Sequence, residues 1–264
     1  KLVNQGMILG NSALIHRKID DGGYVSNDLK DKYKTQSIHI DISFINENNG
    51  LNIELLKKKN PDFKDAEFEY DKIFYVEREV EKMSKSKYNV INPDDICNNY
   101  GADTLRLYEM FLGPLEQSKP WSTSGIIGVH NFLKKLWRLY FHENKIIVKE
   151  SAPNDNNLKT LHRCIKKVAG DIENFSFNTA VSTLMITVNE LTQQKCTSKS
   201  ILEPLSIIIS SFAPHIAEEI WQQLGNTHSI TSCNYPDYDE KYLHDITKIY
   251  PVSINGKLKY KIEL

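Results

Sequence analysis

The stretch VHNFLKKLWRLY, at positions 129–140, decides the fold of the larger part of this chain. Its apolar residues recur at intervals of three and four positions: Val129, Phe132, Leu133, Leu136, Trp137 and Tyr140. Because an α-helix makes one turn every 3.6 residues, this spacing places them on one face. The serine and threonine side chains at 122–124 offer caps just upstream. The sequence therefore predicts an amphipathic helix that begins after these caps and buries a wide apolar face.

Three further helices are predicted downstream, over 157–174, 177–193 and 199–224, because the same spacing returns there. In the last of them Pro204 predicts an early start and Pro214 a kink, since proline lacks the N–H that a continuing helix uses. Four helices in succession favour an antiparallel bundle.

The N-terminal part has a shorter period, and small strands and loops are predicted over 20–81. The motif NPDD at 92–95 predicts a capped helix over 93–100. A second helix is predicted over 103–112, before the Gly-Pro pair at 113–114. The fold class expected for the chain is therefore mainly α, an antiparallel helix bundle preceded by a small α/β part.

The composition is that of a globular protein, with 264 residues, 40% hydrophobic and 25% charged. The longest apolar runs are far shorter than the roughly 20 residues that cross a bilayer, so we expect no membrane partner. The four cysteines show no CxxC pair, which indicates a reducing, cytoplasmic setting. The pattern around Asn255-Gly256 predicts a β-hairpin over 250–260. The chain starts at Lys1 and stops within that pattern, and we therefore expect a piece of a longer protein.

The net charge of −1 hides a basic segment, because residues 129–170 hold nine basic and three acidic side chains. On the first predicted helix the basic positions are Lys134, Lys135, Arg138, His142 and Lys145, and on the next they are Lys159, Arg163, Lys166 and Lys167. Each set recurs at three or four residues and forms a stripe opposite the apolar face. For one helix a solvated charged face is the simpler interpretation, whereas two consecutive stripes favour contact with phosphates.

A second basic cluster is the run Lys82-Met83-Ser84-Lys85-Ser86-Lys87, which has no carboxylate until Asp94. Ammonium and hydroxyl groups together suit phosphate oxygens. On composition alone a solvated loop is the commoner interpretation. The chain has no Gly-rich phosphate loop and no metal-binding spacing of histidines, so we expect no metal ligands.

The letters KMSKS at 82–86 match the signature of class I aminoacyl-tRNA synthetases at every position. The runs NPDDI at 92–96, YGADTLRLYEMFLGPLEQ at 100–117 and KPWSTSGI at 119–126 resemble the leucyl-tRNA synthetases of the bacterial type. The resemblance is close over about 82–138, and the helical layout agrees over 139–224.

The resemblance implies an enzyme that activates leucine with ATP and Mg²⁺ and transfers it to tRNA(Leu), acting as a monomer in the cytoplasm. It implies that Lys85 contacts the ATP phosphates with Lys82 in support, as the catalytic lysines. Met83, Ser84 and Ser86 complete the ATP-binding loop. It also implies that the basic positions of the two stripes, apart from His142, bind tRNA, mostly through its backbone.

The resemblance divides the chain into five parts. They are the end of the catalytic-domain sheet (1–10), a small inserted strand and loop module resembling the leucine-specific one (11–81), the KMSKS loop with connecting helices (82–120), the tRNA-binding helical bundle (121–235), and a linker with the start of a C-terminal β segment (236–264). The module at 11–81 fits a peripheral decoration equally well.

Two departures from the family have consequences. The family places glycine where this chain has Tyr88, so a turn with positive φ is disfavoured there. The second nucleotide-binding signature, HIGH, is absent, as are the leucine pocket and the editing domain, and we expect this fragment to be inactive alone. The alternative is a non-catalytic synthetase-derived module that binds RNA or protein, although such a module has no need of an intact KMSKS loop.

Overall fold

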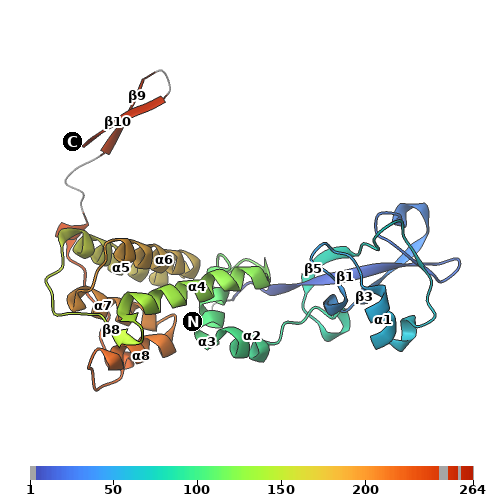
Figure 1. Ribbon diagram of the computed structural model, residues 1–264, viewed down its shortest axis with the longest axis horizontal. Coiled ribbons are helices and arrows are strands. Elements are labelled where there is room, and N and C mark those ends of the chain that lie inside the picture. The colour runs from blue at the N-terminus through green and yellow to red at the C-terminus, as the bar shows by residue number, and fades with distance from the viewer. Residues whose placement is uncertain (1–3, 244–248, 255–256, 264) are drawn as a thin grey trace. The chain divides into compact units, whose positions relative to one another are not determined.

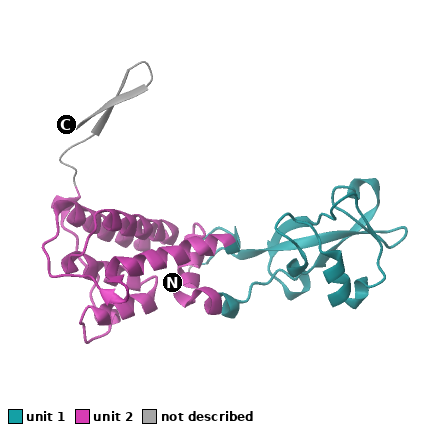
Figure 2. Cartoon of the chain, in the orientation of Figure 1, with its two compact units in different colours: residues 1–96, 116–123 teal, residues 97–115, 124–264 magenta. Residues whose placement is uncertain are grey.

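The computed structural model describes residues 4–243, 249–254 and 257–263 (Figure 1). Within them lie eight α-helices and a small mixed sheet, so the predicted mainly α class is confirmed. The chain divides into two compact units, one formed by residues 1–96 and 116–123 and the other by 97–115 and 124–264 (Figure 2). No helix in the described part is long and apolar enough to span a membrane.

Unit 1 is built around one long strand. Its strands are β1 (Ile8–Lys18), β2 (Tyr24–Val25), β3 (Thr35–Ile40), β4 (Phe68–Glu69), β5 (Glu77–Lys82) and β6 (Lys119–Pro120). Strand β1 pairs antiparallel with β2, β3 and β5 and parallel with β6. It runs without a break through Gly10 and Asn11, across the boundary that the sequence predicts between 1–10 and 11–81.

The core of unit 1 lies between this sheet and the short helix α1 (Ile53–Lys59). Ile15 and Leu56 are fully buried there and Phe74 nearly so. The side chain of Asn52 caps α1 by accepting the N–H of Leu55 at 2.9 Å. The strands predicted within 20–81 are therefore present, and they enclose a small apolar core of their own.

Helices α2 (Pro93–Tyr100) and α3 (Ala102–Phe111) follow as predicted, to within one residue at each end. Proline takes the first position of α2, where no N–H is needed. Gly101 separates the two helices with a φ of 89°, a left-handed conformation that glycine adopts without strain.

Unit 2 contains the bundle. Its remaining helices are α4 (Thr123–Tyr140), α5 (Asp155–Glu173), α6 (Phe177–Gln193), α7 (Lys199–Ser210) and α8 (Pro214–Gln223). Five of the six positions predicted for the apolar face of α4 are buried, with Leu136 and Tyr140 fully enclosed, whereas Trp137 is only half-buried. The Tyr140 hydroxyl donates to the carbonyl of Leu202 at 2.7 Å, which satisfies the polar group inside the core. A capping box at Asn154 starts α5 two residues before the predicted position.

The single helix predicted over 199–224 is wrong, because the structure has two. Helix α7 ends at Ser210, and Pro214 begins α8 instead of kinking a continuous helix. Ala213 adopts φ −132° and ψ 74°, outside the helical region, as the residue before a proline tends to do. Pro204 lies inside α7, which starts at Lys199 as predicted.

The first basic helix is also shorter than its pattern indicates. Helix α4 ends at Tyr140, and a small hairpin follows, formed by β7 (Phe141–His142) and β8 (Lys145–Ile146). Glu143 and Asn144 turn it with positive φ, the geometry of a tight hairpin. The prediction that His142 and Lys145 continue the helical stripe is therefore wrong.

The predicted C-terminal hairpin is confirmed as a strand pair. Strands β9 (Ile249–Ile254) and β10 (Lys257–Glu263) pair antiparallel, and Lys257 lies opposite Ile254. The two residues predicted for its turn, 255–256, lie outside the described residues.

Candidate ATP loop and RNA-binding surface

The KMSKS segment forms a structured loop in unit 1. Strand β5 ends at Lys82, Ser84 is extended, and residues 85–87 form one 3₁₀ turn. Tyr88 closes this turn with φ 51° and ψ 31°. The expectation that the chain lacks a positive φ at this position is wrong, because the left-handed turn is present although tyrosine disfavours it. A residue with a Cβ in this conformation costs about 1–2 kcal/mol, which the surrounding contacts must offset.

Asn89 is the residue that holds the loop in place. Its Oδ1 accepts the backbone N–H of Ser84 at 2.8 Å, and its Nδ2 donates to Ser12 Oγ on β1 at 2.8 Å. The asparagine is buried, and β1 approaches it closely at Gly10, where an added Cβ would lie 2.5 Å from the Asn89 carbonyl oxygen. Asn89 thus ties the start of the loop at Ser84 to strand β1, and glycine at position 10 leaves the room that this close approach requires.

The three lysines of the loop differ in what they contact. Lys87 forms an ion pair with Glu81, and His39 Nε2 lies 2.6 Å from the same carboxylate. The hydrogen bond from Lys87 is the largest contribution that lowers the pKa of Glu81, to about 2. Lys82 and Lys85 are exposed and have no ion pair within the described part of the chain. Two of the three ammonium groups are therefore available to a ligand.

Hydroxyl groups flank the available lysines. The Oγ atoms of Ser84 and Ser86 lie 2.9 Å apart, and Met83 is half-buried between Lys82 and Ser84. A group of amines and hydroxyls on a short loop can donate several hydrogen bonds to phosphate oxygens and add positive charge as a phosphate leaves. The described residues contain no cluster of three or more histidine, cysteine or acidic side chains that could hold a metal ion.

In unit 2 the basic residues of α4 are largely free of carboxylates. Lys134 and Arg138 are exposed, and no ion pair joins them to any described residue. Lys135 donates to the amide oxygen of Asn189 at 2.6 Å, a neutral partner that leaves its charge uncompensated. Lys145 is exposed on β8.

The basic residues of α5 are occupied by partners in the same chain. Lys167 pairs with Asp171, and Lys166 lies 4.0 Å from Glu240 and over the ring of Tyr238. Lys159 and Arg163 are engaged as well. The two stripes predicted together from spacing therefore differ in the charge that they present.

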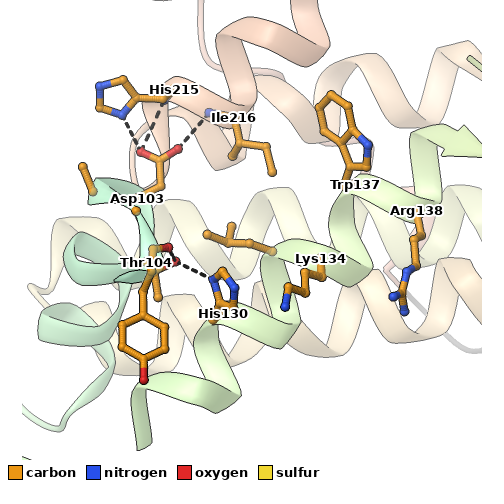
Figure 3. Close-up of a pocket in the computed structure, with 12 residues that line it drawn as sticks. Asp103, Thr104, His130, Lys134, Trp137, Arg138, His215 and Ile216 are labelled. Carbon is orange, nitrogen blue, oxygen red and sulfur yellow. Dashed lines mark hydrogen bonds and ion pairs between the residues drawn. The ribbon is translucent and has the colours of Figure 1, made fainter. Parts of the chain in front are cut away.

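Lys134 and Arg138 also line a cavity of about 730 Å³ within unit 2, which Figure 3 shows from close by. At one end of it Asp103 of α3 caps helix α8. Its carboxylate accepts the backbone N–H of Ile216 at 2.8 Å and the backbone N–H of His215 at 3.3 Å. The ring nitrogen Nδ1 of His215 lies 2.8 Å from the same carboxylate. Helix α8 has no capping side chain of its own, so Asp103 supplies the cap from a distant part of the sequence.

Family models match two parts of the chain. Residues 54–121 match tRNA synthetases class I (I, L, M and V), and residues 154–264 match the anticodon-binding domain of tRNA ligase. The KMSKS loop lies within the first of these ranges, so that part of the chain is similar to class I tRNA synthetases.

Curated relatives give a more specific similarity, to the leucine–tRNA ligases. The leucine–tRNA ligases of Christiangramia forsetii and Flavobacterium psychrophilum are 57% and 60% identical over the whole chain, which spans 28% of the length of each. A LeuRS from Agrobacterium radiobacter, solved as a ternary complex with tRNA and LeuAMS, is 27% identical with a TM-score of 0.56. That alignment covers 70% of this chain and 25% of the other. The chain is homologous over its full length to a segment of leucine–tRNA ligase.

Reasoning from the sequence missed two residues that organise these sites, Asn89 and Asp103. Each has a partner more than 70 positions away, Ser12 for Asn89 and Ile216 for Asp103, and no local pattern shows these contacts. Cys164 is buried in α5, and burial raises the pKa of its thiol to about 11, so that the neutral form is favoured.

Proposed function

We propose that this chain is the part of a leucine–tRNA ligase that supplies the KMSKS loop for ATP and a surface for tRNA(Leu). The proposal depends on the difference between the three lysines of the loop. Lys87 forms an ion pair with Glu81, while Lys82 and Lys85 are exposed and have no ion pair in the described chain. The complete enzyme would be a cytoplasmic monomer, with the five parts of the chain in the roles that the sequence predicts.

The chemistry proposed for the loop is transition-state electrostatics. The leucine carboxylate attacks the α-phosphate of ATP and pyrophosphate leaves, a transfer that requires alignment and positive charge but no protein nucleophile. Lys85, supported by Lys82, would neutralise the charge that builds on the departing phosphates, with Ser84, Ser86 and Met83 shaping the loop. Mg²⁺ would arrive with ATP, since lysines and hydroxyls suit phosphate oxygens rather than a cation.

For tRNA we propose backbone contacts on the bundle. Lys134, Lys135, Arg138 and Lys145 present uncompensated charge, and Lys159, Arg163, Lys166 and Lys167 would join them only by exchanging partners within the chain. Such contacts recognise the shape of an RNA rather than its bases. The non-catalytic alternative is not favoured, because the full-length match is to ligases and the loop lysines are kept available.

The test is a substitution in the full-length enzyme. Lys85→Ala should slow leucine-dependent pyrophosphate exchange by roughly 10²–10³, the loss expected for one preorganised donor. Lys72→Ala, which removes an exposed lysine of unit 1 outside the loop, is the matched control and should leave the rate unchanged. Wild-type exchange in the Lys85 variant would refute the assignment.

A further inference from the structure

The cavity in unit 2 lies where α3, α4 and the start of α8 meet (Figure 3). Its volume of about 730 Å³ is in the range of small-ligand sites. The backbone contacts proposed for the tRNA leave this volume unused, because phosphates bind to an open surface and need no cavity.

Aromatic rings line the cavity. Trp137 is half-buried and stacks on Phe141 with ring centroids 4.0 Å apart, which holds the indole in one orientation. Tyr100 meets His130 edge to face at 5.7 Å, and His130 is fixed in turn by Thr104. Rings that are held before a ligand arrives make good stacking surfaces for a planar group, because little freedom is lost on binding.

The charge of the lining selects the kind of planar group. Lys134 and Arg138 contribute two cations without an ion pair in the described chain. Among the lining residues, all of them described, Asp103 is the one carboxylate. Its oxygens are in contact with the backbone N–H groups of His215 and Ile216 and with the His215 ring nitrogen. The cavity therefore favours a ligand that combines a flat ring with negative charge.

We propose that this cavity takes one unstacked nucleotide of the tRNA, with its base against the aromatic rings and its phosphate on Lys134 and Arg138. The inference rests on the proposed function and extends it: the surface would bind a base of the tRNA in addition to the sugar-phosphate backbone. Single-stranded RNA positions are bound in this manner, by stacking together with phosphate contact.

The test fills the cavity without removing a cation. Ala102 lines it and is exposed, so Ala102→Trp places a ring in the volume; Ala152→Trp, at an exposed position outside the lining, is the matched control. In the full-length protein Ala102→Trp should weaken tRNA(Leu) binding about tenfold at every salt concentration, because the stacking of the base is lost. The dependence of the affinity on salt concentration should stay the same, because no phosphate contact is removed. Trp137→Ala should act similarly, and Trp137→Phe should restore most of the affinity.

A second measurement needs no variant. Wild-type protein is irradiated in complex with tRNA(Leu) in which 4-thiouridine replaces uridine, and the attached peptides are identified by mass spectrometry. Crosslinks to Trp137 or Tyr100 support the inference. Their absence, together with wild-type affinity in Ala102→Trp, overturns it. If charge reversal of Lys134 and Arg138 still weakens binding in that case, the proposed function stands and only the nucleotide site fails.

Discussion

Helices α4 and α5 carry basic side chains at the same spacing, yet they differ in what those side chains contact. On α4, Lys134 and Arg138 meet no carboxylate in the described chain, whereas on α5 Lys166 and Lys167 meet Glu240 and Asp171. A cation that is already paired releases less free energy on binding phosphate, because its first partner must be given up. The comparison teaches that the number of basic residues on a helix does not measure the uncompensated charge that the helix presents.

The largest expected effect separates the two helices directly. Lys134→Glu with Arg138→Glu should weaken tRNA binding by about 10–100-fold in the full-length enzyme and reduce the salt slope by about two, since two phosphate contacts are lost. The same reversal at Lys166 and Lys167 should cost less than about fivefold. Titrations at several salt concentrations measure both, and equal losses would contradict the comparison.

The KMSKS loop shows the same contrast between a paired lysine, Lys87, and an unpaired one, Lys85. The effect expected from substituting them is smaller than that for the two helices. Lys87→Met should release Glu81 and speed hydrogen exchange of the loop amides, including Ser84, by about fivefold, as expected for about 1 kcal/mol from one charged hydrogen bond. Lys85→Met should not change this exchange, because the Lys85 side chain forms no ion pair in the described chain and the substitution keeps its backbone carbonyl, which accepts the N–H of Tyr88. Mass spectrometry of the peptide that contains the loop measures both variants, and equal exchange would show that Lys87 does not hold it.

The same ion pair predicts a pH dependence. The pKa of Glu81 is lowered from 4.5 to about 2, so its stabilising contribution is complete above about 4.5 and is lost as the pH falls through about 2. Between these values protection of the loop should decline in the wild type and stay flatter in Glu81→Gln, which does not titrate. Parallel profiles for the two proteins would refute the role of Glu81.

The smallest expected effect comes from removing an ion-pair partner of α5. Glu240→Gln removes the carboxylate 4.0 Å from Lys166 and makes α5 more like α4. Exposed ion pairs at such distances are weak, so tRNA affinity should rise only about twofold. Gln223→Ala, at an exposed position of α8, is a control of similar size, and a decrease in affinity with Glu240→Gln would contradict the interpretation of α5 as neutralised.

The features that were predictable from the sequence are local ones. Periodicity located α4, α5 and α6, since their buried faces repeat every three or four residues, and the capped proline at 93 located α2. The end of α4 was missed because His142 and Lys145 continue the helical spacing, although Glu143 and Asn144 turn the backbone into a hairpin. Spacing alone carries no information about a left-handed turn.

The state of the site residues depends on which side chains meet in the folded chain, and the motif and the spacing do not show this. The six residues of the loop do not show that Lys87 forms an ion pair and Lys85 does not. This difference arises in the fold, where Lys87 meets Glu81 of strand β5. Lys166 and Glu240 are likewise separated by several helices. Tyr88 taught the opposite lesson, since the turn formed despite a residue that disfavours it.

The cap that Asp103 places on α8 bears on where this protein can be divided for expression. A fragment that begins at the first residue of α4 would have every helix of the bundle but would leave the N–H groups at the start of α8 without their carboxylate. The smallest piece expected to fold cooperatively therefore begins before α3. The family match at 154–264 and the compact unit that contains this cap, 97–115 with 124–264, therefore have different bounds.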